Sequence, residues 1–249
     1  MRTRSLALIA SLAASLMAAP AMADATYTWN TYSPGGSTNS VSGSGAGNQY
    51  TFTSGSSSIK VRAYSLDNTT SATFQTATVG LYDHGLGVTY QGESTASPNH
   101  AVDNVGKFDF LLIEFDGPLK NLGFQIGWKN GSTGDTDIQA WVGTGAAGLN
   151  LAGSTACSGG PCDFTELASL GFGSTQIFND VPLDTPKSVT GQGRYLLISG
   201  RLTTDLDDYF KVSVLNGTRS TSVPEPSSLM LLGAAVAGIG FAGRRRRAA

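Results

Sequence analysis

The sequence predicts an all-β domain, a two-layer antiparallel β-sandwich of the jelly-roll type, flanked by an N-terminal signal peptide and a short C-terminal transmembrane sorting helix. Three observations predict this fold: the middle of the chain is rich in Gly, Ser and Thr, short β-rich segments follow one another between turn residues, and helix-forming runs are few. We therefore divide the chain into a signal peptide (residues 1–23), a β-sandwich domain (residues 24–222) and a sorting segment (residues 223–249).

The first residues have the pattern of a secretory signal peptide. Arg2 and Arg4 form a short basic region, residues 6–17 are apolar, and Ala21 and Ala23 form a small-x-small cleavage site. Twelve apolar residues are too few to span a bilayer, which argues against a first transmembrane helix. We expect the Sec translocon and signal peptidase as partners, with cleavage after Ala23.

The predicted strands of the middle domain follow one another closely. They cover residues 27–32, 50–53, 59–64, 72–82, 88–91, 107–115, 122–128, 138–142, 195–199 and 209–215. The Gly/Ser-rich residues 34–48 are interpreted as a flexible loop within the domain. About ten such strands fit two packed antiparallel sheets.

The strongest core signal lies at residues 107–128. Apolar residues occupy both faces of its first part: Phe108, Phe110 and Leu112 on one side, and Leu111, Ile113 and Phe115 on the other. Such a strand is expected in the centre of the fold. The Asp116-Gly117-Pro118 sequence predicts a turn. The residues after it predict the second strand of a hairpin, with one inward face made of Leu122, Phe124, Ile126 and Trp128.

The charge of the middle domain argues against one class of partner. The whole chain has 16 Lys+Arg and 18 Asp+Glu; setting aside the six arginines of the two end segments and Glu225 leaves 10 basic and 17 acidic residues, a formal charge of −7. This domain has no basic footprint for nucleic acid, so we expect no nucleic-acid partner.

The end of the chain combines three features in a fixed order. Val223, Pro224, Glu225 and Pro226 form an extended, accessible strap, because the two prolines fix their own φ and lack backbone donors. An uncharged run at residues 227–243 follows, and as a helix it would reach about 25 Å, slightly less than a bilayer core. The cluster Arg244, Arg245, Arg246 and Arg247 then sets the orientation by staying in the cytoplasm.

These three features resemble the PEP-CTERM sorting signal, which is read by exosortase in bacteria that make extracellular polysaccharide. The resemblance implies that Val223, Pro224, Glu225 and Pro226 are recognised by an exosortase-like protease while the helix is transiently in the membrane. An ordinary single-pass tail anchor is the alternative interpretation of the same residues.

A central block resembles a group of exosortase-dependent surface proteins. The resemblance lies in four stretches: Leu86-Gly87-Val88 through Glu93, Pro98-Asn99-His100-Ala101-Val102-Asp103-Asn104, Phe110-Leu111-Leu112-Ile113-Glu114-Phe115-Asp116 and Ile126-Gly127-Trp128. It covers roughly a quarter of the chain and transfers no catalytic residue.

Cys157 and Cys162 are the only cysteines. In an exported protein such a pair across a short loop predicts a disulfide. A two-ligand metal clip or a redox pair is the alternative, but no histidine is nearby and the Cys-x-x-Cys spacing is absent.

Residues that could support catalysis are few. His84 and His100 are the only histidines, and no Gly-x-Ser-x-Gly elbow accompanies them. Glu93, Glu114 and Glu166, with the aspartates, could supply the carboxylate pair of a glycosidase, but only their separation in space could decide this. We predict no catalytic residue and no enzymatic activity.

Several loops carry residues that could bind a metal ion. Oxygen ligands of the type calcium takes occur in three loops, at Asp103 and Asn104, at Asp135 and Asp137, and at Asp205, Asp207 and Asp208. None of these loops matches an EF-hand, and solvated turn residues are the alternative, so we assign no metal and no cofactor.

A glycan platform would need an exposed aromatic ring. Among Trp29, Trp128 and Trp141, the phase of Trp128 predicts a core position, whereas Trp141 is out of phase with Ile138 and Val142 and is predicted to be exposed. Trp141 is therefore the candidate for stacking on a sugar ring.

The sequence thus predicts a non-enzymatic protein that is exported, held briefly at the inner membrane, and left in the cell envelope or extracellular matrix. Extracellular polysaccharide is a candidate partner there. A carbohydrate-binding module using Trp141 and a secreted hydrolase are the alternatives.

Overall fold

Strands dominate the computed structural model. It describes residues 24–32, 39–40, 49–94, 97–131, 135–153, 157, 159–203 and 205–220, in which the only helix is the short 3-10 helix η1. The strands are β1 (Ala25–Asn30), β2 (Asn39–Ser40), β3 (Gln49–Ser54), β4 (Ser57–Leu66), β5 (Gln75–Tyr82), β6 (Gly85–Thr89), β7 (Val102–Asp103), β8 (Phe108–Lys129), β9 (Ile138–Gly143), β10 (Gln176–Phe178), β11 (Lys187–Val189), β12 (Gly193–Gly200) and β13 (Tyr209–Arg219), and η1 spans Phe164–Ala168. The all-β prediction is confirmed.

Residues Thr26–Arg219 form one unit of the chain, and the second unit consists of the two end segments. The predicted signal peptide with Ala21 and Ala23, the sorting tetrapeptide 223–226 and the arginines 244–247 lie outside the described residues. Among the described residues there is no helix of the length and apolar character that membrane crossing needs.

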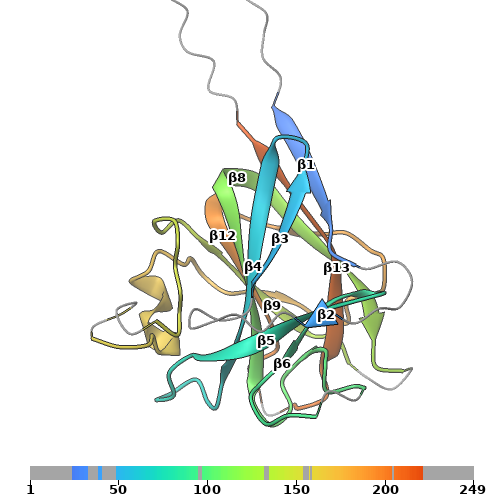
Figure 1. Cartoon of the computed structure of the whole chain (residues 1–249), viewed down its shortest axis with the longest axis vertical. Helices are drawn as coiled ribbons and strands as arrows, with labels where there is room; N and C mark the ends of the chain where they lie inside the picture. Colours follow the sequence, from blue (N-terminus) through green and yellow to red (C-terminus); the bar gives the residue numbers. More distant parts are fainter. Residues whose placement is uncertain are drawn as a thin grey trace, which may run out of the picture. The chain divides into compact units, whose positions relative to one another are not determined.

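The centre of the sheet is a closed ring of five strands. β8 pairs with β4, β4 with β5, β5 with β6, β6 with β13, and β13 again with β8 (Figure 1). β5 contributes to both sides, because residues 75–77 pair with β4 and residues 78–82 with β6. The predicted sandwich is broadly correct, but its two sheets are joined through β5 and β8 into a barrel with further strands outside it.

The predicted hairpin at residues 116–118 is wrong. β8 continues through this sequence for 22 residues, and its two halves have different partners. Residues 108–115 pair with β4 and, over 110–114, with β12, whereas residues 120–129 pair with β13. Because β4 and β12 occupy both edges of the first half, the second half cannot pair with it and bends into the other sheet, as Figure 1 shows.

The first half of β8 is buried on both faces, as predicted. Leu111, Ile113 and Phe115 belong to the main core inside the barrel. Phe110 and Leu112 belong to a second core on the opposite face, which is closed by the segment around η1.

The first and last strands of the unit are neighbours. β1 lies beside β13, the hydroxyl oxygens of Thr26 and Thr218 are 3.2 Å apart, and the backbone N–H of Thr31 donates to the carbonyl of Ser213. The two strands therefore run antiparallel, with residues 26 and 218 side by side.

Both cores should contribute to stability. We expect Leu111→Ala and Leu112→Ala each to lower the free energy of unfolding by about 2–5 kcal/mol, since each removes a fully buried side chain from a different core. Urea unfolding monitored by circular dichroism measures this. The control Thr53→Ala, at an exposed position of β3, should stay within about 0.5 kcal/mol of the parent; a Leu112→Ala variant that matches this control would contradict the second core.

Candidate functional site

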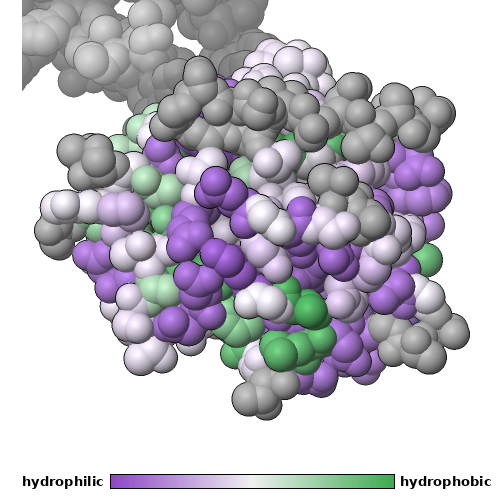
Figure 2. Space-filling view, turned by 60° about the horizontal axis from the view of Figure 1, so that its bottom comes forward, coloured by the Kyte–Doolittle hydropathy of each residue, from purple (hydrophilic) through white to green (hydrophobic). Residues whose placement is uncertain are grey.

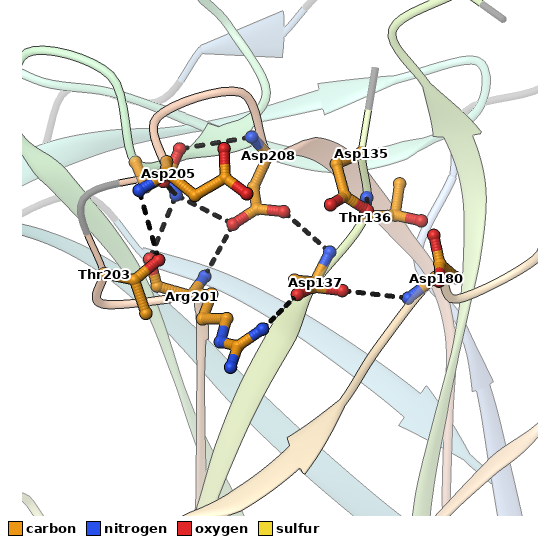
Figure 3. A network of polar contacts seen from close by, with 9 residues as sticks. Asp135, Thr136, Asp137, Asp180, Arg201, Thr203, Asp205 and Asp208 are labelled. Carbon is orange, nitrogen blue, oxygen red and sulfur yellow. Dashed lines mark hydrogen bonds and ion pairs between the residues drawn. The ribbon is translucent and has the colours of Figure 1, made fainter. Parts of the chain in front are cut away.

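Three loops that carry the predicted oxygen ligands meet at one end of the barrel. Asn104 follows β7, residues 135–137 precede β9, and residues 201–208 connect β12 to β13. The parallel bridge between Asp135 and Asp208 joins two of these loops (Figure 3). Figure 2, which brings the bottom of the first view forward, shows a mostly hydrophilic surface broken by small hydrophobic areas.

Asp208 is the centre of the resulting network. One carboxylate oxygen, Oδ1, accepts from the backbone N–H of Asp137 at 2.6 Å, and Oδ2 accepts from Asn104 Nδ2 at 2.7 Å and from the backbone N–H of Arg201 at 3.0 Å (Figure 3). The side chain is 2 % exposed. Both oxygens thus serve to join three loops.

Asp137 is used in the same way. Its Oδ2 lies 2.6 Å from Arg201 Nη1 in an ion pair, and its Oδ1 accepts from the backbone N–H of Asp180 at 2.9 Å. Asp137, Asp208 and Asn104 therefore have structural roles, but they are buried and are not the solvated turn residues that the sequence suggested.

The remaining acids of this end form a surface triad. Carboxylate oxygens of Asp135, Asp205 and Asp207 lie within 4.8 Å of one another, and Asp205 and Asp207 are exposed. A hydrogen bond from Asp205 raises the pKa of Asp207, with burial as a smaller cause. Exposed carboxylates lie this close in many proteins that bind no ion, so this triad alone assigns no metal.

A second acidic group is buried next to this end. Asp109 is 0 % exposed and Asp103 is 1 % exposed. Burial is the main reason why the pKa of Asp103 rises to about 8 and that of Asp109 rises well above its usual range; burial also raises the pKa of Glu93 to about 7. Sequence reasoning did not single out Asp109. The available signal was an acid placed between Phe108 and Phe110 in an otherwise apolar strand.

The predicted disulfide is present. Cys157 and Cys162 are bonded, with their Cα atoms 5.0 Å apart. Cys162 lies in the second core and its carbonyl accepts from the backbone N–H of Phe74. Because both sulfurs are in the bond, the alternative of a two-ligand metal clip has no thiolate to use.

The predicted exposure of Trp141 is wrong. Its side chain is 3 % exposed, its Nε1 donates to Thr175 Oγ1 at 2.8 Å, and its ring packs against Phe110 and Phe164. The side chains of β9 alternate as predicted, but the outer face that carries Trp141 is covered by the segment around η1 and by Thr175. Trp141 has no free ring face for a sugar.

The other two tryptophans differ in burial. Trp128, predicted to be in the core, is only half-buried, and the ammonium of Lys211 lies 4.5 Å from its ring centroid. Trp29 is 1 % exposed and belongs to the main core.

The candidate catalytic residues have separate structural contacts. His84 Nε2 lies 3.4 Å from Asp83, and His100 Nε2 lies 3.0 Å from the ammonium of Lys211. Glu114 is paired with Arg62 at 3.4 Å, and Glu166 completes the capping box of η1. Glu93 accepts from the backbone N–H of Tyr90 at 3.0 Å.

A pocket of about 370 Å³ lies elsewhere, beside β9 and β10. Its lining consists of Val142, Thr144, Gly171, Gly173, Ser174, Gln176, Thr190, Gly191 and Gln192, without a carboxylate, imidazole or thiol. Two clusters of polar and ionisable side chains thus stand out among the described residues: the network around Asp208 and the buried acids beside it.

Comparison with known protein families identifies the C-terminal segment of the chain. Residues 222–247 match the model of the PEP-CTERM protein-sorting motif, so the chain carries this sorting signal. No curated protein and no solved structure matches the chain significantly.

The Asp208 network should make stability depend on pH. Burial raises the pKa of Asp208 to about 7, and the charges of Asp137 and Asp135 add to this, while backbone donors from Asp137 and Arg201 oppose it. The folded state therefore binds the proton more tightly than the unfolded chain, whose aspartate has a pKa of about 3.9. This contribution to stability is complete below pH of about 4 and is lost as pH rises through 7.

We expect Asp208→Asn to flatten the decline in the free energy of unfolding between pH 4 and pH 8, measured by urea unfolding at several pH values. The exposed Asp184→Asn is the control and should keep the wild-type slope. An Asp208→Asn variant with an unchanged slope would refute the contribution of this carboxyl.

Trp141 should act through packing. We expect Trp141→Ala to lower the free energy of unfolding by about 3–5 kcal/mol, because the buried ring is lost from the second core. Trp141→Phe, which keeps an aromatic ring but loses the bond to Thr175, should cost less. Equal stability of Trp141→Ala and the parent in urea unfolding would contradict the burial.

Proposed function

We propose that this protein is the non-catalytic cargo of an exosortase-type enzyme, exported through the Sec translocon and left in the cell envelope or extracellular matrix. The PEP-CTERM motif carries the proposal, because it implies sorting to the cell surface by such an enzyme. Signal peptidase would remove residues 1–23. The arginines 244–247 would keep the last residues in the cytoplasm until the exosortase acts near Pro224, Glu225 and Pro226.

The middle domain would be the part delivered. Its formal charge of −7 favours solubility in a hydrated polysaccharide layer, and the disulfide suits an oxidising exterior. Its candidate catalytic residues serve as partners of Lys211, Arg62 and a helix cap, which favours a structural or matrix role over hydrolysis.

The sorting step can be tested by replacing the acidic residue of the motif. We expect Glu225→Ala to leave the full chain uncut and bound to the membrane, since the recognition element is lost. Membrane and surface fractions of cells that contain the exosortase would be compared by immunoblotting and mass spectrometry. Ser227→Ala, just outside the tetrapeptide, is the matched control and should be processed normally.

Normal processing and release of Glu225→Ala would count against recognition at this motif. The same fractionation in cells without the exosortase should give the wild-type chain the behaviour of Glu225→Ala. If the wild-type chain still reaches the surface at its processed size in those cells, the proposed route is wrong.

A further inference from the structure

Four oxygen atoms at one end of the barrel are buried without a hydrogen-bond partner. They are both carboxylate oxygens of Asp109, Oδ2 of Asp103 and the hydroxyl oxygen of Ser65. The three residues are 0 %, 1 % and 1 % exposed. Buried polar atoms are almost always paired, so a concentration of unpaired oxygens needs a physical explanation.

Three strands place these oxygens together. Ser65 of β4 and Asp109 of β8 are direct cross-strand partners, so their Cβ atoms lie about 4.5–5.5 Å apart on the same face. This is the inner face, which carries Leu111 and Ala63 one step further along the two strands.

Asp103 approaches the pair from β7, which lies against β8. Its Oδ1 accepts from the backbone N–H of Val105 at 2.9 Å, which leaves Oδ2 as the unpaired atom. After burial, the charge of Asp103 is the next cause that raises the pKa of Asp109, in agreement with two neighbouring carboxyls.

The basic group that acts on Asp109 does not neutralise these acids. Among the described residues, Lys107 is the cation whose charge lowers the pKa of Asp109, and its effect is the smallest of those acting on that carboxyl. The backbone N–H of Asp103 also lowers this pKa, but it makes no hydrogen bond of normal geometry to either oxygen. Its ammonium is already engaged, 2.9 Å from Asp67 Oδ1 and 2.9 Å from Gln75 Oε1. An unpaired buried carboxylate is strongly destabilising, so two together require a positive partner or bound protons.

Protonation of Asp103 and Asp109 does not by itself explain the unpaired oxygens. Two neutral carboxyl groups at this site would each carry an O–H group that needs an acceptor, and neither carboxylate oxygen of Asp109 has a hydrogen-bond partner. A cation, in contrast, can be bound by the unpaired oxygens of Asp103, Asp109 and Ser65 in the positions that they occupy. Two carboxylates and a hydroxyl are hard oxygen ligands, which is the set that calcium prefers, completed by waters or carbonyls.

We propose that Asp103, Asp109 and Ser65 form an internal site for a divalent cation of the calcium class, which ties β4, β7 and β8 together at the end of the barrel. The charge of the half-buried Glu93 acts on both aspartates. The site is separate from the exposed triad Asp135, Asp205 and Asp207. Because the cation binds the folded state only, it stabilises the domain.

Thermal unfolding of the full chain tests the site. The protein is treated with EDTA, exchanged into metal-free buffer and titrated with CaCl2, with MgCl2 and with KCl at matched ionic strength. We expect calcium at about 100 times its Kd to raise Tm by about 5–10 °C, and KCl to have little effect. No response to calcium would overturn the proposal, and an equal or larger response to magnesium would overturn the assignment to the calcium class.

Variants locate the binding. Asp109→Asn keeps the shape of the side chain but removes a charged ligand, so we expect its calcium response to disappear while its Tm in EDTA equals or exceeds that of the parent. Asp205→Asn, in the exposed triad, is the matched control and should respond like the parent. If the control loses the response and Asp109→Asn keeps it, calcium binds at the surface and the internal site is refuted.

Two further variants make the test independent of the folding of Asp109→Asn. Ser65→Ala removes one neutral ligand and should weaken calcium binding several-fold in isothermal titration, and Asp103→Asn should abolish it. Wild-type affinity in both variants would overturn the proposal.

Discussion

The pairing of β8 on both edges and the burial of both its faces are the constraint on which the rest of this structure depends. The first half of the strand lies between β4 and β12, and its side chains enter two separate cores. With both edges occupied, the second half must find partners in the other sheet, where β13 and β11 receive it. The closed ring follows from this single strand, and a closed ring leaves fewer exposed sheet edges to protect.

Polar groups are concentrated at one end of the five-stranded barrel. The two carboxylate oxygens of Asp208 accept hydrogen bonds from N–H groups of residues 104, 137 and 201 and so connect the three loops. Beside it, Asp103 and Asp109 enter an environment that disfavours charge. The carboxyl of Asp208 accepts three hydrogen bonds and joins loops together, whereas both oxygens of Asp109 are buried without a hydrogen-bond partner.

The local sequence pattern was sufficient for the fold class and for much of the core. Alternation predicted the inner faces of β4 and β9, and the double apolar alternation of residues 108–115 predicted a central strand. The turn at residues 116–118 was predicted wrongly because a Gly-Pro sequence also fits a strand that bends between sheets. Whether the chain turns back as a hairpin or continues as a bent strand depends on which strands pair with the edges of the first half of β8. This pairing cannot be seen in the local sequence.

The same limit explains why the burial of Trp141 and the convergence of the acidic loops were not predicted. Trp141 is covered by the segment around η1, and the sequence of this segment gave no signal of packing over β9. The convergence of Asn104, Asp137 and Asp208 joins loops up to 104 positions apart. The loop chemistry of each was recognised in the sequence, but their contacts required the closed barrel.

The adjacency of residues 26 and 218 has a geometric consequence for a protein tethered through either terminus. Both connections leave from the same corner, and β13 runs from that corner to Tyr209, about 30 Å away at the spacing of extended chain. The carboxylates around Asp208, next to Tyr209, therefore lie at the opposite end of β13 from the two residues at which the chain enters and leaves the barrel.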